Sequence, residues 1–384
     1  MRAAGIVCEF DPFHEGHRHL IREARARLSE KDGDFAVVCI MSGAFTQRGL
    51  PAWGDKWERA KNAVLGGADL VVELPAVYAC ASAQLFARGA VRILAGFGTP
   101  CILAFGSESG DAEILSGASL FLSENMEKIR DRIPALLKEG LSFPAAREKA
   151  ACALDPSYPA EILRQPNDLL ATEYLTQARL LGLSPEAIAV KRIGRGHHSS
   201  ASGIRESEHA AQPERYENAA ERLFAMTAAK ILAMSEEELD RIASSGGGLG
   251  RRLKHAVRGA RTFDELAAAV KTKAYTRTRT DRLLAQILLG IQRDLVDRAQ
   301  VYIRPLAMNR TGARLLKEIR EEERSDLPIV TKPAEDMRKY PAIRETLAKD
   351  IYAQDLFLLL YGEDLYAGSD YVRHPFVAET EKSF

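Results

Sequence analysis

The sequence has few of the features that mark secreted, membrane or disulfide-stabilised proteins. No apolar run approaches the ~20 residues that span a bilayer, and the first apolar stretch is too short and too soon followed by charge to be a signal peptide. The chain has only five cysteines, an odd number without a C-x-x-C pair: Cys8, Cys39, Cys80, Cys101 and Cys152. We therefore expect a cytoplasmic protein with reduced thiols, no structural metal site, no membrane association and no evident protein partner.

Net charge is also lacking, but its absence conceals an asymmetry. The 384 residues contain 53 Lys plus Arg and 53 Asp plus Glu. Residues 251–320 hold 17 of the basic and only 6 of the acidic residues, so the remainder of the chain is acidic. A basic segment of this kind indicates nucleic-acid binding, although solvated helix faces give the same composition.

The alternation of segment types indicates the fold class. Short runs rich in Val, Ile and Cys alternate with amphipathic stretches of helical length, and the expected strands are 5–10, 35–41, 69–74, 101–105 and 187–193. This order predicts right-handed crossovers and a parallel sheet. We predict an α/β protein with an N-terminal Rossmann-like domain, residues 1–205, followed by a mainly α-helical basic domain, residues 206–384.

The stretch at residues 4–20 is the first candidate site. An expected strand ends at Asp11-Pro12, and a helical pattern begins at His17, so His14, Gly16 and His17 fall in the turn between strand and helix. Such a helix start directs free N–H groups and the positive end of the dipole at an anion. The alternative is a surface turn with two incidental histidines. Zinc is a poorer interpretation, because the second histidine follows three residues after the first rather than four.

Other polar loops follow the expected strands. Because ligands of parallel sheets gather at the carboxyl ends of the strands, Arg48, the segment 106–108 and the histidine turn should converge there. The segment 194–205 contains Ser200, Ser202 and Arg205 at an expected helix start. These groups could hold the β and γ phosphates of a nucleotide, or Ser202 could be an ordinary N-cap.

The basic segment contains K-T-K-A-Y-T-R-T-R-T-D-R at residues 271–282. Threonine and Tyr275 alternate with cations, a composition that suits contacts to a phosphate backbone and stacking on bases. The candidate RNA-binding side chains are Lys271, Lys273, Arg277 and Arg279.

Taken together, these segments resemble one family, the bacterial tRNA(Met) cytidine acetate ligases of the H-x-G-H nucleotidyltransferase superfamily. The blocks that carry the resemblance include E-F-D-P-F-H-E-G-H (9–17), M-S-G-A-F-T-Q-R-G-L-P-A (41–52), D-K-W-E-R-A-K (55–61), P-N-D-L-L-A-T-E-Y-L (166–175) and Y-I-R-P-L-A-M-N-R-T-G (302–312). Two positions depart from the family pattern. Asp11 replaces the usual asparagine, and Ser202 replaces the usual threonine.

The resemblance implies a two-step reaction. Acetate attacks the α-phosphorus of ATP, which is a substrate accompanied by Mg²⁺, and the exocyclic amine of the wobble cytidine in elongator tRNA(Met) then accepts the acetyl group. His14 and His17 are the expected catalytic residues. Arg48 and Lys56 are added as further phosphate or substrate contacts. The expected ATP-binding positions are Val7, Cys8, Glu9, Phe10, Asp11, Pro12, Phe13, His14, Glu15, Gly16, His17, Arg18, His19, Leu20, Gly106, Asn167 and Arg192, with Ser200, Ser202 and Arg205.

Two alternatives remain at this stage. One is a small-molecule adenylyltransferase that uses the same H-x-G-H chemistry, and the basic helical half argues against it. The other is a nucleotide-sensing RNA-binding protein without catalysis, and the intact His14, His17 and S-x-S-x-x-R pattern argue against that.

Overall fold

The fold is built around one sheet. The structure, a computed structural model, describes residues 1–98, 101–192, 201–246, 248–272 and 275–379. The strands that these residues form are β1 (Arg2–Cys8), β2 (Phe35–Ser42), β3 (Leu70–Leu74), β4 (Ile102–Ser107), β5 (Glu186–Lys191), β6 (Pro305–Met308) and β7 (Phe376–Val377).

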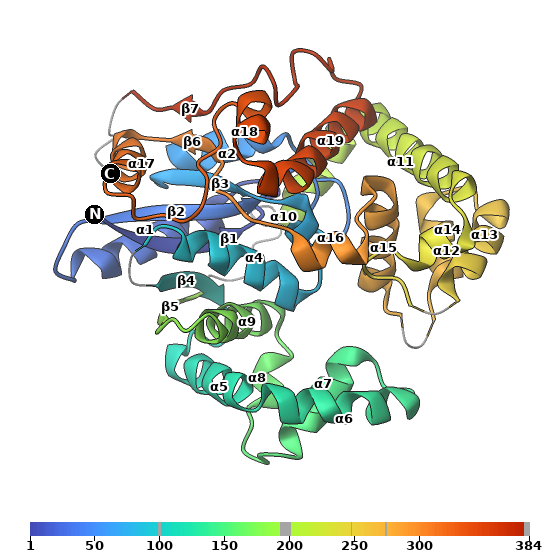
Figure 1. The fold of residues 1–384 in the computed structure, drawn as a ribbon, viewed down its shortest axis with the longest axis horizontal. Helices are drawn as coiled ribbons and strands as arrows, with labels where there is room; N and C mark the ends of the chain where they lie inside the picture. The colour runs from blue at the N-terminus through green and yellow to red at the C-terminus, as the bar shows by residue number, and fades with distance from the viewer. Residues whose placement is uncertain (99–100, 193–200, 247, 273–274, 380–384) are drawn as a thin grey trace.

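The strand order is β5-β4-β1-β2-β3-β6-β7 (Figure 1). The first five strands in this order are mutually parallel, which confirms the predicted α/β class and its parallel sheet. β6 pairs antiparallel with β3, and β7 is parallel to β6. The first strand was predicted too late: it ends at Cys8, because Phe10 has a φ of 47° that no strand can accommodate.

Helices cover both faces of the sheet, as parallel strands require. Alternate residues of each strand face opposite sides: Val37 and Cys39 pack against one set of helices, Val38 and Ile40 against the other. The first face carries α1 (Glu15–Ser29) and α2 (Lys56–Leu65); the second carries α4 (Ala83–Ala95), α9 (Pro166–Leu180) and α17 (Arg310–Glu321). The predicted helix at residues 56–65 is confirmed at both ends.

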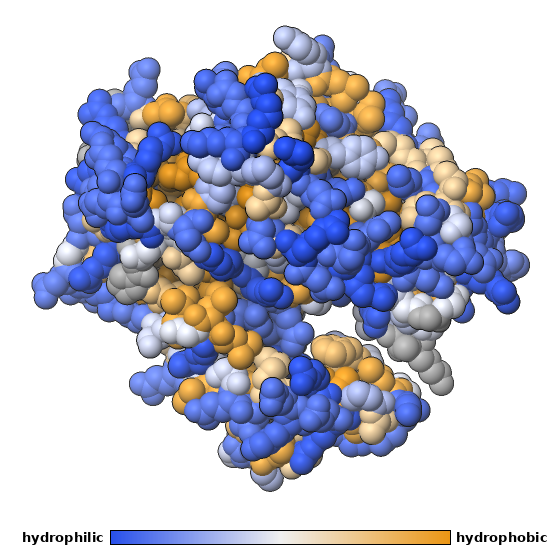
Figure 2. Space-filling view, viewed as in Figure 1, coloured by the Kyte–Doolittle hydropathy of each residue, from blue (hydrophilic) through white to orange (hydrophobic). Residues whose placement is uncertain are grey.

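A helical lobe lies between β4 and β5 in the sequence. It contains α5 (Ala112–Glu124), α6 (Met126–Lys138), α7 (Phe143–Cys152) and the short α8 (Ala160–Leu163). Part of the lobe has its own small core around Ile129 and Ala150. It extends downward in Figure 1, and Figure 2 shows a hollow between it and the helices on the right.

The C-terminal half is mainly helical, as predicted. Its helices besides α17 are α10 (Ala201–Ala211), α11 (Pro213–Ala233), α12 (Glu236–Asp240), α13 (Leu249–Gly259), α14 (Phe263–Val270), α15 (Arg277–Leu289), α16 (Arg293–Arg298), α18 (Pro333–Lys339) and α19 (Arg344–Tyr361), with a 3-10 turn at Pro341–Ile343. None of the helices in the described residues is long and apolar enough to cross a membrane. Residues of the C-terminal half return to the sheet as β6 and β7. The predicted division at residue 205 therefore does not separate the sheet from the helices, and it stays a prediction about which half performs which function.

The two halves share part of one core. The apolar core of the C-terminal helices includes Ala44, Phe45 and Ala52 from the loop after β2, and residues of the short α3 (Ala76–Ala79). The loop at residues 42–52 therefore lies at the junction between the sheet and the C-terminal helices.

Candidate active site

The turn between β1 and α1 holds the two motif histidines against each other. His14 is the N-cap of α1, and its Nδ1 accepts a hydrogen bond from the backbone N–H of Gly16 at 3.0 Å. His17, one turn later, accepts the backbone N–H of His14 on its own Nδ1 at 3.3 Å. The rings stack with centroids 3.7 Å apart. The helix start that the sequence predicted is thus capped by an imidazole rather than by a hydroxyl or carboxylate.

These hydrogen bonds determine the protonation of both rings. A nitrogen that accepts a hydrogen bond carries no proton, so each neutral ring has its hydrogen on Nε2. Burial and nearby Arg192 and Arg205 lower the pKa of His14, and burial with His14 and Arg192 lowers that of His17 to about 3. Neither Nε2 donates to a residue that the structure describes. Both histidines are therefore neutral near pH 7, with an Nε2–H available to a ligand.

Gly16 is required by the position of the His14 ring. A Cβ on Gly16 would lie 2.8 Å from Cε1 and 3.1 Å from Nδ1 of His14, closer than side-chain atoms normally approach. The glycine of the motif thus keeps the capping imidazole in place. Behind it, Phe10 and Phe13 contact the ring of His17, with centroids at 4.8 and 5.8 Å.

The remaining residues of 7–20 have mainly structural contacts. Val7 and Cys8 belong to β1, and the Cys8 thiol donates to a backbone carbonyl of β2 at 3.6 Å. On α1, Arg18 donates to Glu15 at 3.1 Å, and His19 lies 3.1 Å from a guanidinium nitrogen of Arg22. Leu20 packs in the core beneath the helix, while Pro12 follows a cis peptide bond.

Asp11 connects the histidine turn to α10. One carboxylate oxygen accepts the backbone N–H of Trp53 at 2.6 Å, and the other lies 3.9 Å from the guanidinium of Arg205. Arg205 also donates to the backbone carbonyl of Asp11 at 2.5 Å and to the hydroxyl of Ser202 at 3.4 Å. Asparagine at position 11 could accept from Trp53 but could not pair with Arg205. The N-cap alternative for Ser202 is wrong, because α10 already contains it.

Glu9 holds the loop after β2. Its carboxylate accepts the backbone N–H of Gln47 at 2.6 Å, and burial raises its pKa. Arg59, from α2, donates to the carbonyl of Glu9 at 2.6 Å and to that of Ser42 at 3.1 Å, which fixes the ends of β1 and β2 together. Arg48 projects from this loop with an exposed side chain.

A second pair of loops meets at the ends of β4 and β5. The carboxylate of Glu108 accepts N–H groups from Asn167 and Asp168 at the start of α9. In return, the buried Asp168 accepts backbone N–H groups of Glu108 and Ser109 at 3.1 and 3.0 Å. The sequence analysis did not identify this reciprocal arrangement. The available signal in the sequence was Asp168 at the third position of a helix that begins with proline.

Arg192 and Gly106 lie beside each other at this edge. A Cβ on Gly106 would be 3.7 Å from Cγ of Arg192, an ordinary contact. Since the charge of Arg192 lowers the pKa of both His14 and His17, the structure brings these four predicted residues together. The predicted Ser200 lies outside the described residues.

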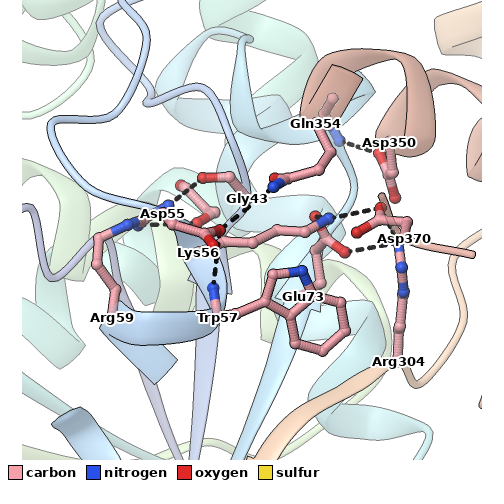
Figure 3. Close-up of polar contacts among 12 residues, drawn as sticks. Gly43, Asp55, Lys56, Trp57, Arg59, Glu73, Arg304, Asp350, Gln354 and Asp370 are labelled. Atoms are coloured by element: carbon pink, nitrogen blue, oxygen red, sulfur yellow. Dashed lines mark hydrogen bonds and ion pairs between the residues drawn. The ribbon is translucent and has the colours of Figure 1, made fainter. Parts of the chain in front are cut away.

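The structure contradicts the expectation for Lys56. Its side chain is wholly buried, and its ammonium contacts Glu73 at 2.7 Å and Asp370 at 2.8 Å (Figure 3). Arg304 contacts the same two carboxylates, each at 2.9 Å. We call these four side chains the buried ion cluster. An ammonium committed to two carboxylates without exposed surface cannot bind a phosphate.

The expected RNA-binding side chains lie at the start of α15 and just before it. Lys271 is exposed, and Arg279 stacks on Tyr275 with its guanidinium 4.0 Å from the ring centroid. Arg277 is paired with two carboxylates, those of Asp264 and Asp281. A hollow of about 490 Å³ is lined in part by Lys271 and Arg277. Lys273 lies outside the described residues.

Comparison with known proteins identifies the family. The family described as HIGH Nucleotidyl Transferase matches residues 1–369. The tRNA(Met) cytidine acetate ligase of Acetivibrio thermocellus is 32% identical, over 97% of this chain and 99% of that protein. The one of Syntrophotalea carbinolica is 35% identical, over 97% and 94%. A crystal structure of Thermotoga maritima TmcAL bound with alpha-thio ATP has a TM-score of 0.87 and 27% identity, covering 99% of this chain and 100% of that one. The chain therefore belongs to the tRNA(Met) cytidine acetate ligase family of HIGH nucleotidyltransferases.

Proposed function

We propose that this protein activates acetate with ATP and transfers the acetyl group to the wobble cytidine of elongator tRNA(Met), giving N4-acetylcytidine. The relatives described above are named tRNA(Met) cytidine acetate ligases, and a structural neighbour binds alpha-thio ATP. A cytoplasmic location follows from a tRNA substrate. The observation that supports the first step most directly is the pair of neutral histidines whose Nε2–H groups remain available.

In the first step an oxygen of acetate attacks the α-phosphorus of ATP, and the bond to the bridging oxygen of pyrophosphate breaks. Negative charge accumulates on the α-phosphate oxygens as phosphorus becomes five-coordinate. The Nε2–H donors of His14 and His17 would stabilise that charge without giving up a proton. Arg192 and Arg205, whose charges reach His14, would hold the phosphates that leave.

In the second step the exocyclic amine attacks the acetyl carbon. The bond from that carbon to the phosphate oxygen breaks, AMP leaves, and the amine loses a proton. The acyl group is already activated as a mixed anhydride, so alignment of the two reactants supplies most of the remaining acceleration. His14 and His17 should matter little here.

Mg²⁺ fits this site as a companion of the nucleotide. Among the described residues, no three His, Cys, Asp or Glu side chains gather in a group that could hold a metal ion, whereas Mg²⁺ commonly binds through substrate phosphates and water. Bound in that way, it would neutralise charge on the triphosphate.

Residues 206–384 would bind the tRNA, through Lys271, Lys273, Arg277 and Arg279 and the surface around them, while residues 1–205 catalyse adenylation. The nucleotide contacts that we propose within residues 1–205 are the backbone of 7–20 together with Gly106 and Asn167, and Ser200, Ser202 and Arg205 would contact the β and γ phosphates.

Pyrophosphate exchange into ATP tests the proposal. The purified protein should incorporate labelled pyrophosphate into ATP only when acetate is present, because exchange requires reversible formation of acetyl-adenylate. Exchange that is indifferent to acetate would indicate a different acceptor of the adenylyl group. Absence of exchange would support an RNA-binding protein without catalysis.

A further inference from the structure

The loop after β2 and the start of α15 are in direct backbone contact. Gly49 has a φ of 82°, and a Cβ there would lie 2.4 Å from Cα and 2.5 Å from the backbone nitrogen of Arg282. No residue other than glycine fits this contact. Arg48 and Arg282 are consequently neighbours, although 234 positions separate them in the sequence.

Neither arginine is neutralised by a residue that the structure describes. Arg48 is exposed and Arg282 is half-buried, and neither makes a hydrogen bond or ion pair with another residue in the part of the chain that the structure describes. The adjacent carboxylate, Asp281, is already bound to Arg277 at 2.7 Å. The carboxylate of Glu9, whose pKa burial raises and the charge of Arg48 lowers, accepts the backbone N–H of Gln47 in the loop that carries Arg48.

The surroundings of Arg282 disfavour its charge. Burial and the like charge of Arg279 lower the pKa of the Arg282 guanidinium. Proteins usually pair a cation that they remove from water. An arginine that is partly removed from water beside another arginine, with no ion-pair partner among the described residues, is therefore a group that an external anion would satisfy.

We propose that Arg48, Arg279 and Arg282 form a phosphate-binding site for the backbone of the RNA beside the nucleotide that is acetylated. The proposal rests on the proposed function and adds the place where the RNA crosses from the C-terminal helices to the nucleotide edge. The loop that carries Arg48 is bonded through Glu9 to the end of β1, immediately before the histidine turn. A phosphate held here would lead the adjacent nucleotide toward that edge.

The same chemistry could serve the triphosphate of ATP instead of RNA, and the position favours RNA. The arginines whose charge reaches the histidines are Arg192 and Arg205. Arg282 instead lies on α15, in the segment with Lys271 and Arg279.

The test compares Arg282→Met with Arg298→Met, a paired arginine on α16 outside the proposed RNA-binding residues. Methionine keeps much of the side-chain volume and removes the charge. Arg282→Met should weaken binding of elongator tRNA(Met) by roughly 10-fold or more, as loss of a charge-assisted bond implies, and should reduce the slope of log affinity against log salt by about 0.7 to 0.9. Arg298→Met, whose charge Asp294 and Glu345 already neutralise at 3.1 and 2.8 Å, should change affinity and slope less.

Two readouts separate this site from a structural role. Because Arg282 has no ion-pair partner in the described part of the chain and is repelled by Arg279, Arg282→Met should melt at the parental temperature or above it. Pyrophosphate exchange at varied ATP distinguishes the two phosphate sources: an unchanged KM for ATP supports RNA, and a raised KM with unchanged tRNA binding overturns the proposal. The same measurements are repeated on Arg48→Ala. Because Arg48 is exposed, this substitution should leave the fold intact.

Parental tRNA affinity in both Arg48→Ala and Arg282→Met would also overturn the site. Since tRNA binding is measured directly, the result holds whether or not the protein transfers acetate. Failure of the proposed function would appear separately, as loss of acetate-dependent exchange in the parent protein.

Discussion

Two groups of cations in this protein differ in what neutralises them. In the buried ion cluster, Lys56 and Arg304 share the carboxylates of Glu73 and Asp370, with every contact between 2.7 and 2.9 Å. At the junction of the two halves, Arg48 and Arg282 contact no carboxylate among the described residues. The first group joins four distant segments of the chain. The second leaves its charge available to a ligand.

The comparison shows that the residue type alone does not reveal the role of a cation. Lys56 follows a glycine-containing loop and was expected to contact substrate, yet its partners make it structural. Arg282 was not singled out, because nothing in the sequence indicates that Arg277 occupies Asp281. The residues that pair with a cation determine its role, and single substitutions can remove these residues one at a time.

Breaking the buried ion cluster should have the largest effect. Asp370→Asn leaves Lys56 and Arg304 with one carboxylate between them, and we expect a loss of about 3–5 kcal/mol in the free energy of unfolding, as for other buried ion pairs that lose one partner. Urea denaturation measures this loss. Arg373→Ala is the matched control, because the pair of Arg373 with Asp55 is exposed and should contribute at most ~1 kcal/mol. Equal losses in the two variants would contradict the distinction.

Asp350, a buried carboxyl group near Glu73 of the buried ion cluster, should make the stability of the protein depend on pH. Asp350 accepts the backbone N–H of Ala76 and the hydroxyl of Tyr302, and burial together with Glu73 raises its pKa from 3.8 to about 7. The folded state therefore retains a proton that the unfolded state releases. Stability from this group is complete below pH ~4 and is lost as the pH rises through 7, by up to about 4 kcal/mol.

Asp350→Asn should abolish that decline. Urea denaturation between pH 4 and pH 8 gives the comparison, with the parent protein as reference. The prediction is wrong if the stability of the parent protein stays constant or rises over this range and matches that of the variant. Asp350 would then ionise normally.

Removing either imidazole should slow adenylation strongly. His14→Ala or His17→Ala removes an Nε2–H donor to the α-phosphate, and we expect acetate-dependent exchange to fall by ~10²–10³. Chemically prepared acetyl-adenylate should restore part of the tRNA acetylation, since the second step does not use these donors. A melting curve close to the parental one excludes collapse of the fold. Near-parental exchange in either variant would assign the histidines to structure.

Gly16→Ala should have a smaller effect on the same step. The added methyl group would displace the His14 ring from its cap, so we expect exchange to fall by about 10-fold. Gly117→Ala, where a Cβ meets nothing within 4 Å, should retain parental exchange. If Gly16→Ala also exchanges at the parental rate, the close contact does not position His14.

Much of the fold could be predicted from the sequence, because it depends on patterns among neighbouring residues. The helix Lys56–Leu65 and its Asp55 cap were predicted, because both depend on neighbouring residues. β6 and β7 were not predicted, since four and two residues are too few to show periodicity. The site residues also differ in how well the sequence predicts them, according to their distance along the chain. His14, Gly16 and His17 lie within one turn, whereas Lys56 and Asp370 are 314 positions apart.

The transfer of labelled acetate to tRNA tests the central claim most directly. Elongator tRNA(Met) is incubated with the protein, ATP and isotopically labelled acetate, and its nucleosides are analysed by mass spectrometry. We predict one labelled acetyl group on the wobble cytidine, dependent on ATP and strongly reduced in His17→Ala. Unmodified cytidine in the presence of all three components, or an acetyl group that appears equally with His17→Ala, would contradict the account.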